Sequence, residues 1–505
     1  MNKRVLIVNC YFPEIREPVR LINEIPNALA PVLLAGFFSP GHCEIRLHNE
    51  VSAGFLEVYA PDLLAWPDLV VFTGLTAAFD RMLHLTAYMR TLRPRIVTVA
   101  GGPAIRALPG YARRFFDYVC AGDAEEIREV IRDALGAEYL AEEPTPRYDL
   151  AGWIGRRMGY AESSRNCNFR CSYCSVTADG RPYVAGNLDD LRRQIVAMRR
   201  REVICFQDNQ FYGTDRRFFL DRMGLLKELR RAGYFKYWHA FVADTFLWDD
   251  HNLALARDAG CFSLFVGVES FDEVWLRRMN KTQNTAHSQA KLIKKCLDAG
   301  ILFQYGLVFD PTTRRVADMH RELAYICGDP DLPAPNFIFM AIPFPATPFF
   351  RDRASRGLIL PGTKVRDLEG STLSLRPLDS IDEVARFIST TKNLRGYAAR
   401  HLQRQARFLW RYRKALSPAQ SVVSSAIAMS ILAPAAVSNP GTLLVRQLPR
   451  THVSTTDRLD AVYQPVRRVA TQYADYFRPT LITDAGGCLN EALTDDLLAV
   501  RAGPR

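Results

Sequence analysis

Short apolar runs alternate with longer helix-like runs over the first 140 residues. The helix-like runs cover residues 28–38 and 79–92. The strand-like runs cover residues 4–9, 43–47, 69–73, 96–100 and 118–121. This alternation is typical of a parallel sheet with crossover helices. We therefore predict a doubly wound, Rossmann-like α/β domain over residues 1–140.

Glycine and polar residues gather where three of these predicted strands end. An open α/β sheet binds its ligand at the carboxyl ends of its strands. The sequence therefore predicts a ligand site formed by Thr73, Thr76, Gly101, Gly102, Gly122 and Glu125.

A second α/β region follows a stretch without clear periodicity. Residues 141–160 contain Pro144, Pro146 and Gly152, which favour a linker. Beyond it, strand-like runs cover residues 203–206, 237–242, 262–266, 303–309 and 337–340. This pattern predicts a partial (β/α)6 barrel over residues 161–365, whose chemistry lies in the loops at the strand carboxyl ends.

Three cysteines stand close together near the start of this second region. Cys167, Cys171 and Cys174 have the spacing CxxxCxxC. Zinc sites usually need four ligands in two separated pairs, and the chain has no second CxxC or HxxxH. The other eight cysteines lie mostly in apolar runs, where a free thiol packs as a small hydrophobic group. They are Cys10, Cys43, Cys120, Cys205, Cys261, Cys296, Cys327 and Cys488.

The cysteine spacing, with Tyr173 just before the last sulfur, resembles the signature of the radical S-adenosylmethionine (radical SAM) enzymes. Three thiolates can hold a 4Fe-4S cluster and leave one iron without a protein ligand. In that family the open iron binds SAM, which is split to a 5′-deoxyadenosyl radical. The resemblance implies that Cys167, Cys171 and Cys174 hold the cluster.

Further segments are similar to the same family, in the same order. They are 206–211 around Asp208 and Asn209, Gly267-Val-Glu269-Ser270, residues 306–313, and residues 343–348, where Ala346 replaces the usual glycine. The resemblance implies that Tyr173, Asp208, Asn209, Glu269 and Ser270 contact SAM. For Asp208 and Asn209 a second interpretation stays open, because both residue types also favour turns and helix caps.

The strand ends of residues 1–140 resemble the cobalamin-binding domains that precede many radical SAM cores. The segment that supplies a histidine to cobalt in other cobalamin proteins is absent from residues 10–16. Cobalamin is therefore expected to bind without a protein histidine. The alternative is a Rossmann-like domain that has kept its shape and lost its ligand.

Composition and charge limit the partners and the cellular location that we expect for this protein. The chain has 505 residues, 48% of them hydrophobic, and a formal net charge of +11. The basic residues are scattered, and the chain has no recognisable RNA-binding module, so nucleic acid is not expected as a partner. No secretion signal and no apolar run of membrane-spanning length are evident. The sequence therefore predicts a cytoplasmic protein with reduced thiols.

Residues 366–505 are predicted to be mostly helical. Residues 399–416 combine arginines with aromatic residues, and residues 422–432 form an apolar run. One hypothesis is a helical cap that packs on the barrel and covers the substrate cavity. The other is peripheral contact with the inner membrane face through cationic and apolar side chains.

Together these features predict a cobalamin-dependent radical SAM enzyme. The activity expected from the resemblance is methyl transfer to an unactivated carbon of a natural product, a lipid or a tetrapyrrole-like molecule. The resemblance also implies an electron donor such as flavodoxin or ferredoxin. Two alternatives stay open: a cobalamin-dependent radical cyclase or ring-rearranging enzyme, and a non-catalytic redox or regulatory protein that binds cluster and corrin.

Overall fold

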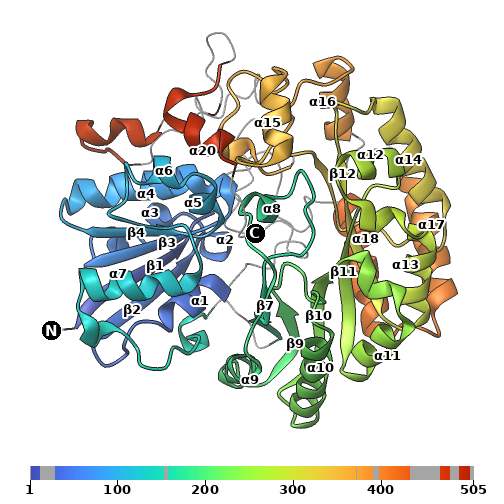
Figure 1. The fold of residues 1–505 in the computed structure, drawn as a ribbon, viewed down its shortest axis with the longest axis horizontal. Coiled ribbons are helices and arrows are strands. Elements are labelled where there is room, and N and C mark those ends of the chain that lie inside the picture. The colour runs from blue at the N-terminus through green and yellow to red at the C-terminus, as the bar shows by residue number, and fades with distance from the viewer. Residues whose placement is uncertain are drawn as a thin grey trace.

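The chain folds around two parallel sheets that lie side by side (Figure 1). The computed structural model describes residues 2–11, 29–152, 157–370, 372–390, 397–432, 467–477, 481 and 488–500. Part of the 10–16 segment discussed above and the chain beyond Leu432 up to residue 466 lie outside these ranges.

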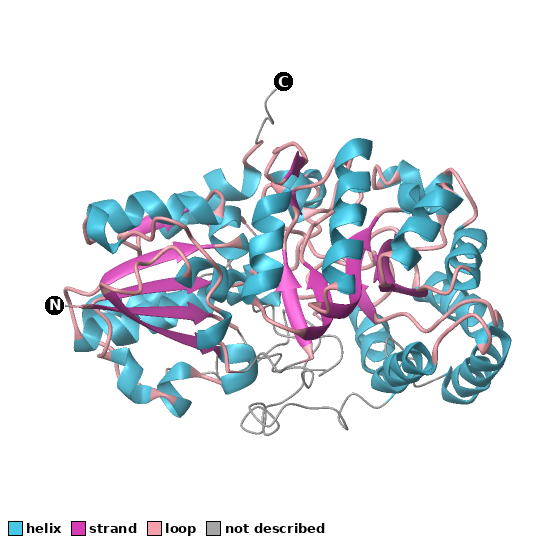
Figure 2. Cartoon of the chain, turned by 90° about the horizontal axis from the view of Figure 1, so that it is seen from below, coloured by secondary structure: helices cyan, strands magenta, loops and turns pink. Residues whose placement is uncertain are grey.

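The first sheet has five parallel strands in the order β2-β1-β3-β4-β5. Helices cover both of its faces (Figure 2). The strand order reverses between β1 and β3, as in doubly wound folds whose ligands bind at that reversal. The predicted Rossmann-like domain is therefore confirmed. Its strands are β1 (Lys3–Asn9), β2 (Cys43–Asn49), β3 (Leu69–Thr73), β4 (Val97–Gly101) and β5 (Tyr118–Cys120).

The helices of this first unit are short apart from α4, whose bounds agree with the predicted run. Buried Val5 to Val8 of β1 show that the sheet centre is covered on both sides. The helices are α1 (Leu29–Ala35), α2 (Glu50–Ala53), α3 (Leu56–Tyr59), α4 (Phe79–Leu92), α5 (Pro103–Ala107), α6 (Pro109–Ala112) and α7 (Ile127–Ala134).

The second sheet has six parallel strands in the order β6-β9-β10-β11-β12-β13. It curls into an open half-barrel with helices on its outer side (Figure 1), as predicted. The first of its strands begins at Met158, inside the range expected to be linker. The strands are β6 (Met158–Ala161), β9 (Arg201–Phe206), β10 (Phe235–Val242), β11 (Cys261–Glu269), β12 (Leu302–Phe309) and β13 (Phe337–Met340).

Successive side chains along each strand point to opposite faces of the half-barrel. In β10, Trp238 and Ala240 are fully buried beneath the outer helices. Their neighbours His239 and Phe241 point to the opposite face, the barrel interior. The helices are α8 (Ser175–Ala178), α9 (Leu188–Ala197), α10 (Arg216–Arg231), α11 (Asp250–Asp258), α12 (Glu273–Arg278), α13 (Gln289–Asp298), α14 (Val316–Gly328) and α15 (Pro348–Ser355).

The C-terminal region packs on the barrel through α16 (Ile381–Thr390), α17 (Ala398–Tyr412) and α18 (Pro418–Leu432). Gln420 of α18 donates hydrogen bonds to the carbonyl oxygens of Phe262, at 2.7 Å, and Gly300, at 3.0 Å. These contacts support the predicted helical cap. Contact with a membrane surface stays a prediction. The side chains that would make such a contact are available on α17, because Trp410 is 70% exposed and Arg413 lies over its ring. No helix among the described residues has the length and apolar character needed to cross a bilayer.

A later segment returns to the first sheet. Phe477 stacks on His84 of α4 with ring centroids 4.3 Å apart. Beyond it, α20 (Thr494–Leu498) lies between α6 and α15 (Figure 1), so it touches both units. The backbone N–H of Ala346 donates to the carbonyl oxygen of Leu497 at 3.0 Å. Sequence regions far apart thus join the two units.

Replacing Asp496 should loosen this junction. Its carboxylate accepts hydrogen bonds from the backbone N–H groups of Gly110, at 3.0 Å, and Tyr111, at 2.7 Å. Loss of such a cap costs about 1 kcal/mol. We expect Asp496→Ala to lower the thermal unfolding midpoint measurably in calorimetry, whereas Asp495→Ala, at an exposed neighbouring position, leaves it unchanged. Equal midpoints for the two variants would contradict this role.

Candidate functional site

The three clustered cysteines lie in one loop between the short strands β7 (Ser164–Arg165) and β8 (Val184–Ala185). Cys174 immediately precedes α8. Two sulfurs face hydrogen-bond donors: the Phe169 N–H lies 3.5 Å from Sγ of Cys167, and Nε2 of Gln283 lies 3.7 Å from Sγ of Cys171. Such donors stabilise thiolates and tune the potential of an iron–sulfur cluster, so the loop fits the predicted cluster.

The three thiols lie close enough to influence one another electrostatically. Burial and then the neighbouring Cys171 and Cys167 raise the pKa of Cys174 to about 11. Burial also raises the pKa of Cys167. Thiols of this kind lose their protons when they bind metal.

The described residues contain no group of three or more His, Cys, Asp or Glu side chains that converges on a single metal ion. A cube-shaped cluster has a different requirement, because each thiolate binds its own iron and the sulfurs stay apart. The cluster ligands Cys167, Cys171 and Cys174 therefore stay a prediction, supported by the donors around the loop.

Glu269 and Tyr173, two of the predicted SAM contacts, meet at a lysine beside the cysteine loop. Nζ of Lys281 donates to Oε1 of Glu269 at 3.2 Å and lies 5.9 Å from the centre of the Tyr173 ring. The neighbouring Tyr173 and Glu269 raise the pKa of Lys281 against the effect of burial. Lys281 was not predicted as a site residue, although it ends the segment that follows the Gly267-Val-Glu269-Ser270 motif.

Backbone geometry at the end of β11 explains how this ion pair forms. Glu269 has φ +63°, in the left-handed region, where the pairing of β11 with β12 shifts register. A Cβ atom at Gly267 would lie 2.7 Å from Oε1 of Glu269 and 2.9 Å from Nζ of Lys281. Glycine therefore leaves the space in which the two charged groups meet.

Asp208 is turned into the protein. Its carboxylate accepts hydrogen bonds from the Ser163 N–H and hydroxyl and from the Ser164 hydroxyl, and it lies 3.5 Å from Arg222. Asp208 is 1% exposed. These contacts favour the structural interpretation that the sequence left open, because a SAM contact would require Asp208 to exchange its partners. Asn209, by contrast, is exposed and faces the space between the two units.

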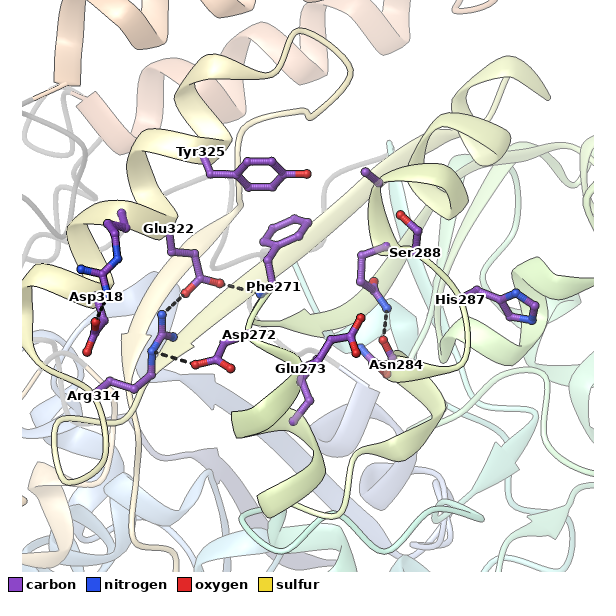
Figure 3. A pocket seen from close by; sticks show the side chains of 14 residues that line it. Phe271, Asp272, Glu273, Asn284, His287, Ser288, Arg314, Asp318, Glu322 and Tyr325 are labelled. Carbon is purple, nitrogen blue, oxygen red and sulfur yellow. Dashed lines mark hydrogen bonds and ion pairs between the residues drawn. The ribbon is translucent and has the colours of Figure 1, made fainter.

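Ser270 is fully buried, and charged side chains outside the cysteine loop hold its hydroxyl. Its hydroxyl donates to Glu322 at 2.9 Å and accepts from Arg314 at 3.2 Å. Arg314 and Glu322 line a charged pocket of about 470 Å³ beside α12, α13 and α14, together with Phe271 and Asp272 (Figure 3). A role of Ser270 in SAM binding stays a prediction that its present contacts do not support.

A cavity of about 250 Å³, here named the interdomain cavity, lies at the carboxyl edge of the first sheet. Four of the six residues predicted for cobalamin line it: Thr73, Gly101, Gly102 and Gly122. Across the cavity lie residues of the second unit, namely Glu162, Arg165, Asn166, Gln207 and Asn209. The structure thus brings the predicted ligand edge against the start of the cysteine loop.

The remaining two predicted residues lie beside this cavity. Thr76 lines a smaller neighbouring pocket near α8. Glu125 accepts hydrogen bonds from Arg165 at 2.7 and 3.0 Å, and Arg165 also donates to Glu162 at 2.8 Å. The sequence analysis missed Arg165, although it directly precedes the Asn-Cys pair that opens the motif.

The geometry of Gly102 keeps this edge open. Its φ of +85° lies in the region that favours glycine, and a Cβ atom there would lie 2.8 Å from Oγ1 of Thr73. The backbone at the end of β4 can therefore approach a ligand closely.

Comparison with known proteins agrees with this architecture. Residues 162–322 match the family model of the radical SAM superfamily. The chain is 23% identical over 318 residues to a hopanoid C-2 methylase of Rhodopseudomonas palustris (strain TIE-1), covering 56% of this chain and 57% of the relative. It is 26% identical over 265 residues to an uncharacterized methyltransferase of Synechocystis sp. (strain ATCC 27184 / PCC 6803 / Kazusa), covering 48% of each. The chain thus spans about half the length of these curated relatives.

Two solved structures share the fold. The apo form of OxsB, described as a cobalamin-dependent SAM radical enzyme, superposes with a TM-score of 0.56 at 14% identity, covering 98% of this chain and 78% of that chain. TsrM from Kitasatospora setae, a radical SAM methyltransferase solved with tryptophan and a SAM analogue, gives a TM-score of 0.51 at 16% identity, covering 72% and 78%.

Fold, cysteine loop and family match agree on a radical SAM domain, matched over residues 162–322, with a doubly wound domain in front of it. The predicted fold is confirmed, and the radical SAM match supports the predicted enzyme class.

Removing any cluster cysteine should abolish cluster formation. We expect Cys167→Ala, Cys171→Ala and Cys174→Ala each to lose the broad visible absorbance and most of the bound iron after anaerobic reconstitution, because an iron–sulfur cluster is held by its thiolates. Cys488→Ala changes an exposed cysteine outside the loop and serves as the matched control. Wild-type iron content in the three loop variants would refute the assignment.

Proposed function

We propose that this protein is a cobalamin-dependent radical SAM methyltransferase that acts on carbon. The observation that carries the proposal is the interdomain cavity. Strand ends of the first sheet and the flank of the cysteine loop line the same space, so a ligand bound at the sheet edge would face the radical-forming site.

Cobalamin is the ligand proposed for this edge. Thr73, Gly101, Gly102 and Gly122 would approach it through backbone and small side chains, with Asn209 opposite. When bound, cobalamin supplies a carrier for a methyl group. Support comes from the shared fold with OxsB, which has been solved with aqua-cobalamin and SAM bound, and from the similarity to a hopanoid C-2 methylase.

SAM is proposed to bind between the cysteine loop and the end of β11. Lys281 offers a cation to the carboxylate of the methionine part, and Glu269 offers a carboxylate to the amino group or the ribose hydroxyls. Tyr173 stacks on Trp275 with ring centroids 5.9 Å apart, which gives this side of the site a rigid apolar wall. Such a wall excludes water, which protects a reactive radical.

The test of this function is product analysis with fully loaded enzyme. Protein reconstituted anaerobically with iron, sulfide and hydroxocobalamin is incubated with SAM, a strong reductant and candidate substrates. We expect 5′-deoxyadenosine, S-adenosylhomocysteine and a product heavier by one methyl group per turnover. Formation of 5′-deoxyadenosine without S-adenosylhomocysteine would favour the cyclase or rearrangement alternative, and formation of neither would favour the non-catalytic one.

Lys281→Met should weaken SAM binding. The substitution keeps the length of the side chain and removes the charge proposed to meet the SAM carboxylate. We expect the Kd for SAM to rise at least tenfold in equilibrium dialysis with reconstituted protein, a loss of about 1.4 kcal/mol or more.

Lys294→Met is the matched control, because Lys294 lies on α13 with its side chain 43% exposed and pairs with Asp298. It should leave the Kd unchanged. Iron content measured on each variant shows whether the cluster is intact. An unchanged Kd in Lys281→Met with full iron content would exclude the proposed contact.

A further inference from the structure

The half-barrel encloses a second cavity, of about 540 Å³, here named the barrel cavity. Side chains from all six strands of the curled sheet contribute to its wall. From β10 these are Tyr237, His239 and Phe241, alternate residues along most of the strand. The cavity therefore extends along the strands and is not confined to one end.

The barrel cavity and the interdomain cavity share one lining residue. Gln207 follows the last residue of β9 and lines both cavities. Its Nε2 lies 3.4 Å from Sγ of Cys205, which lines the barrel cavity as well. A molecule in the barrel cavity would thus have one end next to the space proposed for cobalamin.

The C-terminal region lines the other end of the cavity. Ala419, Val423 and Ile427 of α18 line the cavity at intervals of four residues, so they share one helix face. Besides the bonds of Gln420 to the barrel, Nε2 of Gln405 in α17 donates to the hydroxyl of Ser424 at 3.1 Å. The apolar face of α18 is therefore held against the barrel as a wall.

The wall is mostly aromatic and aliphatic. Phe265 stacks on Phe337 with ring centroids 5.6 Å apart and lies 5.3 Å from Phe241. Burying an apolar ligand against such rings is favourable in proportion to the area removed from water. The volume lies within the range of about 300–1,000 Å³ usual for small-molecule sites.

Two uncharged polar pairs lie in the cavity wall. Nδ1 of His239 lies 2.8 Å from Oγ of Ser263, and Nδ2 of Asn336 donates to Oε1 of Gln304 at 3.1 Å. Burial lowers the pKa of His239 to about 4, so the ring is neutral at pH 7.

The charged residues of the cavity lining lie at one end of the barrel, away from these polar pairs. Among the described residues that line the cavity, the charged ones are Arg157 and Glu202, which lie at the amino end of the strands and pair at 3.7 Å. An ionised ligand in the interior would lose its hydration without gaining a counter-ion there.

We propose that the barrel cavity holds the body of the methyl acceptor, and that this acceptor is an uncharged, predominantly apolar small molecule with a hydrogen-bonding group. The inference rests on the proposed function, and it adds the substrate class and the role of α18. Such a molecule would extend from the α18 wall toward Gln207. Its carbon at that end would face the interdomain cavity, where the methyl group is supplied.

Two variants at adjacent positions of α18 test the cavity. Val423→Trp places an indole into the space, whereas Val422→Trp changes a residue that is 68% exposed and absent from the cavity lining. The probe is N-phenyl-1-naphthylamine, a neutral dye that fluoresces in apolar sites. We expect saturable binding to wild type and to Val422→Trp, and at least a tenfold higher Kd for Val423→Trp.

Competition tests the charge preference. Farnesol should displace the dye from wild type, whereas farnesyl diphosphate should need at least a tenfold higher concentration. Equal affinity of the dye for Val423→Trp and Val422→Trp, or equal competition by both isoprenoids, would overturn the proposal. If the thermal midpoint of Val423→Trp falls well below that of Val422→Trp, Ala419→Trp at the exposed start of α18 replaces it under the same expectation.

The dye readout does not depend on turnover. Displaceable dye binding together with absence of 5′-deoxyadenosine would therefore refute the proposed enzyme function and leave the cavity intact. Methyl transfer together with equal dye binding by the two variants would refute the cavity as acceptor site and leave the enzyme function standing.

Discussion

One arginine links the two units beside the cysteine loop. Arg165 directly precedes the cysteine loop, and it joins Glu125 of the first unit to Glu162 of the second with distances of 2.7 to 3.0 Å. Arg106 and Asp179 add a second link across the interface at 3.0 Å. Single exposed ion pairs contribute little to stability, whereas a connected, partly buried network fixes geometry. Here the network fixes the ligand edge of one sheet against the loop of the other.

The barrel sheet in turn sets the order of the sites around that contact. Its strands run parallel, so their carboxyl ends lie together and place the cysteine loop, Glu269 and Gln207 on one side of the barrel. The amino ends lie together on the opposite side, where α18 covers them. The barrel therefore has a polar end, which faces the proposed cofactor site, and an apolar interior that extends from it along the strands.

The C-terminal region acts at both ends of this arrangement. Its α18 closes the barrel through Gln420, and its last described helix, α20, bonds to both units through Asp496 and the Leu497 carbonyl. Ala346, whose backbone N–H donates the hydrogen bond to the Leu497 carbonyl, has φ +61°. The family element that it resembles has glycine at that position, which adopts this conformation at lower cost.

Local chemistry in the sequence determined the elements and the class of this protein. Apolar periodicity located every strand of the first sheet and most strands of the barrel, because burial imposes that pattern residue by residue. The cysteine spacing indicated the radical SAM class for the same reason, since three ligands in one short loop are set by the chain itself. What each polar side chain contacts was decided by the tertiary structure. Asp208 contacts Ser163 and Arg222 inside the protein, and Lys281 pairs with Glu269. The barrel cavity forms between strands and a helix that are far apart along the chain. The sequence could not show these contacts, because such partners meet only when the sheet curls.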